Sequence, residues 1–288
     1  MLELDFGSTT PKSSEPYKGF VYDLDDKEYR RAEGISQSAI KTLCTEPWKY
    51  FNKVEIPTTP AMIEGTLMHL LFSEPHKLNE KFFILDDMKL AKRLVVEVEI
   101  GDRIPFSRGD FNRVQDCVGY VKQKLKERFD CDLDLMDGEV SFFGEYNGLP
   151  AKARADKITK DRKAVFDFKK CRSAHPKEFL NTACNLDYGI QEVFYRELMG
   201  LDDFVWIAIE TMPVKVNGAD EFMFGLFRAS EIMRDIAKQD IKNAYTILAN
   251  PEKFKEVAYM DEFFSNSLED GLNVVRELVP PLWRQKNI

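Results

Sequence analysis

Two neighbouring segments, Leu149-Pro-Ala-Lys-Ala-Arg-Ala-Asp156-Lys157 and Val165-Phe-Asp167-Phe-Lys169, decide the predicted fold. Because side chains of a strand alternate between two faces, each segment is predicted to form a strand with one apolar and one charged face. The charged turn at residues 160–163 joins the two strands as an antiparallel pair. The face that carries Asp156 then lies beside the face that carries Asp167 and Lys169.

The sequence on either side of this pair extends the pattern into a larger sheet. Residues 139–146 alternate loosely and stop at Asn147-Gly148, a dipeptide typical of a β-hairpin turn. Apolar runs predict two more strands, at 204–210 and 222–227. Helical spacing predicts helices that start after Ser36 and at 48–51, 60–72, 110–129, 176–184, 187–200 and 230–249. We therefore expect an α/β fold in which a central mixed sheet with an antiparallel meander is flanked by helices.

The domain organisation follows from the same pattern and from the composition. Residues 1–18 are rich in Ser, Thr, Pro and Lys and are expected to form a loose arm. Residues 19–288 are expected to form a single domain, with the C-terminal helices from about residue 229 packed on it. The chain is 44% hydrophobic, which excludes disorder over its whole length.

The same composition restricts the setting in which the protein acts. No apolar run approaches the roughly 18–20 residues that a membrane-spanning helix needs, and no secretory signal is visible at the N-terminus. The five cysteines are odd in number and lack the CxxC spacing of a zinc site. We therefore expect reduced thiols and a cytoplasmic protein that does not bind a membrane.

The net charge of −8 speaks against a nucleic-acid partner until its distribution is considered. Residues 151–180 contain ten basic and four acidic side chains, a net charge of +6 that leaves −14 on the rest of the chain. A basic zone around carboxylates suits a polyanionic substrate that reaches a metal site, and a solvated basic face is the alternative.

Asp156, Asp167 and Lys169 are the candidate catalytic residues. Carboxylates are hard oxygen ligands for Mg²⁺, and the ammonium can position a water or stabilise charge on a phosphate. A surface hairpin held by salt bridges is the simpler interpretation of these three residues. His69 on a predicted helix and Gln191, which shares a helix face with Tyr195, are further candidates.

The order of these residues resembles the RecB-type branch of the PD-(D/E)XK nucleases. That order is Gly65-x-x-x-His69, then Asp156, then Asp167-x-Lys169, then Gln191-x-x-x-Tyr195. The flanking segments 35–43, 62–75 and 149–156 are similar to the RecE-like (exonuclease VIII) family of phage and prophage nuclease domains. The resemblance covers about residues 34–215.

The resemblance implies a Mg²⁺-dependent exonuclease, with Mn²⁺ as a substitute, that degrades linear double-stranded DNA from the 5′ end. Such enzymes leave 3′ overhangs for a RecT-like single-strand annealing partner and often act as ring-shaped homo-oligomers. By resemblance, His69, Asp156, Asp167 and the carbonyl of Phe168 would be metal ligands and Lys169 the catalytic lysine. Gln191 would order the site. The residues expected to contact DNA are Ser36, Ser38, Lys152, Arg154, Lys170, Arg172 and Tyr195, with helix capping as the alternative for the two serines.

The sequence departs from the family at one position and lacks other motifs. Lys170 stands where relatives have a threonine, so a hydroxyl near the metal is replaced by a cation. Because no cysteine follows Cys184, we expect no iron–sulfur cluster, and without a phosphate-cradling glycine-rich loop we expect no use of ATP. An endonuclease of the same fold and a DNA-end binding module that does not cut remain alternatives.

Overall fold

The structure is a computed structural model that describes residues 17–89 and 99–255. The described residues divide into two compact units: residues 17–37, 56–89 and 99–238, and residues 38–55 with 239–255. All predicted catalytic and metal-binding residues belong to the first unit. Most of the predicted N-terminal arm lies outside the described residues, and the single-domain prediction stays a prediction.

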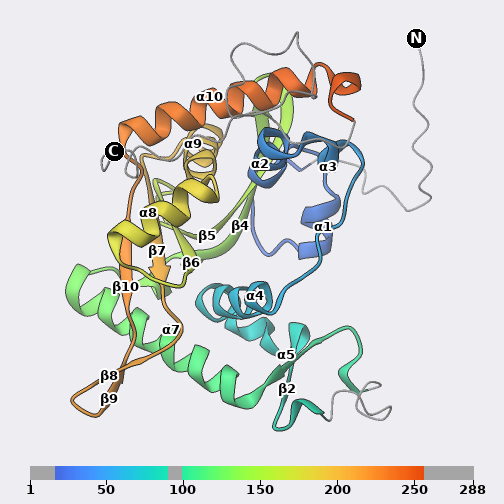
Figure 1. The fold of residues 1–288 in the computed structure, drawn as a ribbon. Coiled ribbons are helices and arrows are strands. Elements are labelled where there is room, and N and C mark those ends of the chain that lie inside the picture. The colour runs from blue at the N-terminus through green and yellow to red at the C-terminus, as the bar shows by residue number, and fades with distance from the viewer. Residues whose placement is uncertain (1–16, 90–98, 256–288) are drawn as a thin grey trace, which may run out of the picture. The chain divides into compact units, whose positions relative to one another are not determined.

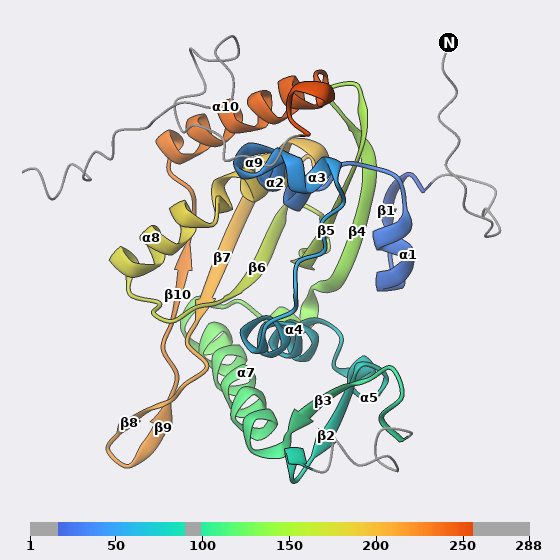
Figure 2. The same cartoon turned by 45° about the vertical axis from the view of Figure 1, so that its right-hand side comes forward.

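A six-stranded sheet forms the centre of the first unit, in the order β1-β4-β5-β6-β7-β10 (Figures 1 and 2). Neighbouring strands are antiparallel except β6 and β7, which are parallel. The mixed sheet with an antiparallel meander and flanking helices confirms the predicted fold class. The strands are Gly19–Val21, Asp137–Tyr146, Leu149–Ile158, Ala164–Lys170, Asp203–Ile209 and Phe224–Phe227.

Local chemistry explains how the meander turns. Asn147 and Gly148 both have positive φ, 49° and 77°, the conformation that a two-residue type I′ turn between β4 and β5 requires. The parallel pairing of β6 with β7 needs a crossover connection, and α8 and α9 supply it. The sequence pattern predicted each of these elements, but the parallel pairing was not specified.

Helices and two small sheets complete the first unit, where the figures show α4 beside α7 and α8 beside α9 (Figures 1 and 2). Helix α4 begins at Pro60, and the hydroxyl of Thr59 accepts a hydrogen bond from the Met62 N–H, as expected of an N-cap. The β8–β9 hairpin extends from the ends of β7 and β10. The elements are α1 (Asp26–Arg31), α4 (Pro60–Ser73), η1 (Pro75–Lys77), α5 (Leu78–Lys81), α7 (Arg108–Phe129), η3 (Leu133–Leu135), α8 (Pro176–Asn185), α9 (Tyr188–Met199), β2 (Phe82–Leu85), β3 (Ile104–Ser107), β8 (Val214–Val216) and β9 (Ala219–Glu221).

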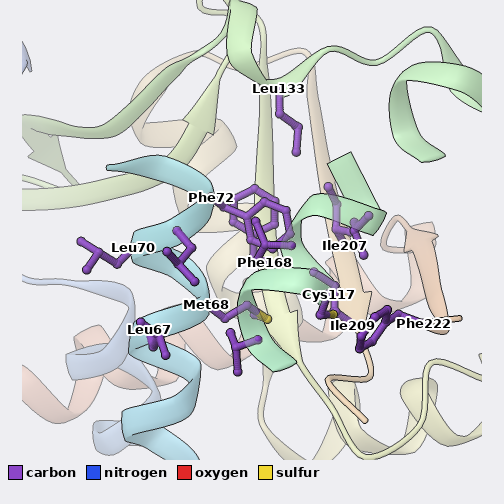
Figure 3. Packing of buried hydrophobic residues seen from close by; sticks show 14 of the residues in the cluster. Leu67, Met68, Leu70, Phe72, Cys117, Leu133, Phe168, Ile207, Ile209 and Phe222 are labelled. Atoms are coloured by element: carbon purple, nitrogen blue, oxygen red, sulfur yellow. The ribbon is translucent and has the colours of Figure 1, made fainter. Parts of the chain in front are cut away.

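A hydrophobic cluster joins α4 and α7 to β6 and β7 (Figure 3). At its centre the rings of Phe72 and Phe168 stack with centroids 4.1 Å apart and an interplanar angle of 12°. Both side chains are buried. Because Phe168 stands between Asp167 and Lys169, this packing fixes the part of β6 that carries the candidate site.

The second unit contains most of α2 (Gln37–Thr45), α3 (Pro47–Phe51), the C-terminal part of α10 (Glu231–Leu248) and η4 (Pro251–Lys253). The Asn52 amide donates to the Lys255 carbonyl at 3.0 Å, which ties the two chain segments of this unit together. Among the residues described, no helix is long and apolar enough to span a membrane.

Candidate metal centre

The candidate site lies where β5 and β6 separate. These strands pair only at Lys157–Phe166 and Ile158–Val165, and Asp156 and Asp167 are the next residue on each strand. Beyond this point the Phe168 N–H donates to the Asp156 Oδ2 at 2.8 Å instead of to a strand. Since the N–H and C=O of one strand residue point to the same side, the Phe168 carbonyl also faces this fork.

His69 reaches the fork from α4. Its Nδ1 lies 3.0 Å from the Asp156 Oδ2. Burial alone would lower the pKa of His69, but the neighbouring Asp156 carboxylate raises it to about 9. Burial would likewise raise the pKa of Asp156, and the charge of His69 lowers it instead. The structure therefore brings together His69 and Asp156, which are far apart in the sequence, as the prediction required.

Asp167 is held by a lysine and a glutamine. Its Oδ2 lies 2.6 Å from the Lys169 Nζ, and its Oδ1 accepts a hydrogen bond from the Gln191 Nε2 at 2.6 Å. Burial raises the pKa of Asp167, whereas the Asp167 carboxylate raises the pKa of Lys169 against the effect of burial. The Lys169 ammonium also lies 4.8 Å from the centre of the Tyr188 ring.

Glu139 on β4 lies near His69 and Asp156, and the sequence analysis did not single it out. One ligand atom each of His69, Glu139 and Asp156 lie within 4.8 Å of one another. Burial, followed by the charge of Asp156, raises the pKa of Glu139 to about 7. The Asn147-Gly148 turn could have identified this residue, because a two-residue loop sets Glu139 opposite Asp156 in the β4–β5 register.

The donor groups at the fork fit a divalent cation. Carboxylates and a main-chain carbonyl are the oxygen ligands of Mg²⁺ and Mn²⁺, and an imidazole can complete such a set. Gln191 is 4% exposed, and among the described residues nothing donates a hydrogen bond to its buried Oε1. An orphaned acceptor beside Asp167 is consistent with a water or hydrated ion at this position.

Two residues that were expected to contact DNA are used inside the protein. The Lys152 ammonium donates to the carbonyls of Tyr29, Arg30 and Ala32 at the end of α1. These three bonds use all its N–H donors. Arg154 donates to the Ser141 hydroxyl, the Asp26 carboxylate and the Leu24 carbonyl. Lys152 therefore has no N–H left for a phosphate, and we leave it out of the proposed DNA contacts. The three bonds of Arg154 use three of its five N–H donors, so its contact with DNA stays a prediction.

Replacing Lys152 by Met is expected to lower the free energy of unfolding by about 2–3 kcal/mol, because the carbonyls at the end of α1 lose a buried charged donor. Urea unfolding followed by circular dichroism measures the change. Lys160→Met is the matched control: this side chain is 68% exposed, so a change within about 0.5 kcal/mol is expected. Equal stability of Lys152→Met and wild type would contradict the capping role.

The remaining predicted DNA contacts take several positions. The Tyr195 hydroxyl accepts from the Arg154 N–H and donates to the Arg154 carbonyl, so it holds the open edge of β5. Lys170 lies 3.8 Å from Glu64, and Arg172 is exposed after β6. Ser36 directly precedes α2, and Ser38 belongs to the second unit. The DNA contacts of Ser36, Ser38, Lys170 and Arg172 stay predictions.

The ten basic residues of segment 151–180 do not form one surface. Lys152 and Lys157 are buried. Lys160 and Lys163 pair with Asp137 and Asp202 in or beside the turn that precedes β6. Lys169 lies at the other end of β6, which spans roughly 20 Å. The basic groups near the fork are therefore a small part of the predicted zone.

Comparison with known proteins relates the chain to others of this fold. A "Putative exonuclease" from Eubacterium rectale superposes with a TM-score of 0.55 at 14% identity, over 90% of this chain and 97% of that chain. A phage-related exonuclease from Haemophilus somnus 129PT gives a TM-score of 0.33 at 13% identity, over 76% and 96% of the two chains. The protein SSO0001 gives 0.24 at 17% identity, over 63% and 86%.

The last two scores are too low to support an argument, and the first shows a shared fold. A search of curated proteins finds no match. The family model of the PDDEXK-like domain of unknown function (DUF3799) matches residues 36–204, which is more than half of the chain and includes His69, Asp156, Asp167, Lys169 and Gln191. The chain therefore belongs to the family of PDDEXK-like domains of unknown function.

Proposed function

We propose that this protein is a metal-dependent nuclease that degrades linear double-stranded DNA from its ends. The observation that carries the proposal is the convergence of Asp156, Asp167, Lys169 and His69 at the β5–β6 fork. Two carboxylates, an imidazole and a lysine at one point form a site for hydrolysis of a phosphodiester bond. A salt-bridged surface hairpin does not account for the burial of both carboxylates.

Each residue has a distinct part in the proposed reaction. Asp156, Asp167, His69 and the Phe168 carbonyl would hold Mg²⁺ or Mn²⁺. An ion held there would supply a positive charge that polarises the phosphoryl group and makes a water easier to deprotonate. Lys169 supplies a positive charge at the phosphate or orients the attacking water. Gln191 holds the Asp167 carboxylate and can accept a hydrogen bond from a water at the site through Oε1.

The finer features of the proposal come from the resemblance of the sequence motifs and from the relative described as an exonuclease. They are Mg²⁺ as the natural ion, 5′→3′ polarity and 3′ overhangs that serve recombination by strand annealing. A RecT-like annealing partner, a ring-shaped homo-oligomer and action in the cytoplasm, including that of a phage-infected bacterium, belong to the same proposal.

The test compares DNA substrates that differ in their ends. The purified full chain is incubated with linear, nicked circular and covalently closed circular duplex DNA, with Mg²⁺ or with EDTA. We expect nucleotides to be released from linear DNA alone and only with the metal. Linear DNA labelled at the 5′ or the 3′ end then gives the polarity.

The other outcomes identify the alternative functions. Cutting of closed circles would replace the exonuclease with an endonuclease of the same fold. Retention of linear DNA without any product would indicate a DNA-end binding module. Release of nucleotides in EDTA would contradict metal dependence.

A further inference from the structure

Glu139 is a largely buried carboxylate that lacks a matching donor. Its side chain is 20% exposed, and its nearest cation is the Arg154 Nε at 3.9 Å. Arg154 directs its own hydrogen bonds to Ser141, Asp26 and Leu24. Within residues 17–89 and 99–255, no N–H or O–H group donates to the Glu139 carboxylate. A buried carboxylate without donors is costly unless a cation compensates its charge.

The backbone at Glu139 is also unusual. Its φ is +48°, in the left-handed region that a residue with a side chain rarely adopts inside a strand. The pairs Gly138–Lys157 and Val140–Ala155 are bridged, whereas Glu139 and Asp156 between them are not. The conformation therefore departs from the regular ladder at the one position opposite Asp156, and such local strain persists only where the surroundings hold it in place.

Gly138 and Ser73 supply those surroundings. A Cβ atom at Gly138 would lie 2.6 Å from the Ser73 carbonyl oxygen, so only glycine lets β4 approach the end of α4 this closely. The Ser73 hydroxyl donates to the Asp156 carbonyl at 2.9 Å. Ser73 thus contacts β4 at Gly138, next to Glu139, and β5 at Asp156.

The same contact sets the place of His69. Residues four apart on a helix share a face, so His69 lies one turn before Ser73 on the side of α4 that meets the strands. The close approach at Gly138 determines how near His69 comes to the carboxylates of Glu139 and Asp156. These are the three groups whose ligand atoms lie within 4.8 Å of one another.

We infer that Glu139 is a ligand of the divalent cation, and that Gly138, through its contact with Ser73, is a positioning residue for the ligand set. The inference rests on the proposed function, since it assigns an additional residue to the proposed metal site. Glu139 binds the ion directly. Gly138 acts through the separation of α4 from β4 and does not touch the ion.

The test measures Mn²⁺ binding to the full chain by isothermal titration calorimetry, without DNA and without turnover. Glu139→Gln keeps the shape of the side chain and removes its charge. The Kd for Mn²⁺ is expected to rise by at least about 10- to 100-fold, the loss typical of replacing a residue that only hydrogen-bonds to a metal ligand. Glu145→Gln is the matched control, because Glu145 is an exposed residue on the same strand. Its Kd should equal that of the wild type.

Gly138→Ala tests the positioning role while every ligand is retained. We expect a weaker affinity for Mn²⁺ in a folded protein, whereas Gly119→Ala on α7, where a Cβ meets no atom within 4 Å, should bind as the wild type does. If Gly138→Ala does not fold, Glu139→Gln alone decides the assignment of Glu139.

The outcomes separate this inference from the proposed function. If Asp156→Asn loses Mn²⁺ binding but Glu139→Gln binds as tightly as wild type, the metal site stands and the role of Glu139 is refuted. A Glu139→Gln protein that is less stable without metal but unchanged in Kd would also refute it and leave Glu139 as a partner of Arg154. If the wild type binds no Mn²⁺, both proposals fail.

Discussion

Lys169→Met lowers the rate of DNA cleavage by about 10²- to 10³-fold, if the proposed reaction takes place at the fork. Methionine keeps an unbranched, flexible side chain that is one heavy atom shorter, and it removes the ammonium that lies over the Tyr188 ring. The variant leaves Asp167, whose side chain is 3% exposed, without its closest cation. Mn²⁺ binding should persist because the carboxylates and His69 are retained. Single-turnover release of nucleotides from linear duplex DNA measures the effect.

Lys163→Met provides the comparison for this variant. Lys163 lies just before the same strand, its side chain is 55% exposed, and it pairs with Asp202 away from the fork. We expect its cleavage rate to match that of the wild type. Circular dichroism of both variants establishes that they are folded. Near-normal cleavage by folded Lys169→Met would remove the lysine from the mechanism.

Phe72→Ala lowers the free energy of unfolding by about 3–5 kcal/mol, the usual cost of truncating a buried phenylalanine. Phe72 is 1% exposed and stacks on Phe168, so its removal leaves a cavity beneath the segment that carries Asp167 and Lys169 (Figure 3). Thermal and urea unfolding measure the loss. Because the carbonyl and N–H of Phe168 belong to the fork, we also expect weaker Mn²⁺ binding.

A Phe→Ala substitution at an exposed position tests whether the loss of stability comes from the burial of Phe72. Phe129 at the end of α7 is 53% exposed, and Phe129→Ala should change the free energy of unfolding by less than about 0.5 kcal/mol. Equal effects of the two substitutions would show that the cluster around Phe168 does not stabilise the fold.

Local patterns were sufficient to predict the β4–β5–β6 meander and the placement of Asp156 and Asp167 next to each other on neighbouring strands. The Asn147-Gly148 turn has the two positive φ angles that its dipeptide suggests, and strand alternation put the carboxylates on neighbouring strands. Since His69 lies on a separate helix, only the resemblance to a family connected it to Asp156. The hairpin register places Glu139 opposite Asp156, but the sequence analysis did not use this register to identify Glu139.

Other features depend on contacts between segments that no local pattern reveals. The charge pattern of β5 made Lys152 and Arg154 resemble a DNA-binding surface, yet both side chains hold the short α1 segment, which was not predicted. A positive charge beside a strand satisfies main-chain carbonyls as readily as phosphates. The predicted basic zone is not one surface, because some of its lysines are buried and the others lie at different ends of the strands.

The fork also has a consequence for how the protein acquires its site. His69, Glu139, Asp156, Asp167 and Gln191 come from different helices and strands, so they meet only after contacts of long sequence separation have formed. A cation that needs several of these groups cannot nucleate folding from one local segment. If a cation binds as proposed, it would bind only the folded state and, at a concentration of 100 Kd, would stabilise that state by about 2.7 kcal/mol. The ion would thus stabilise the protein only after it has folded, in addition to taking part in the reaction.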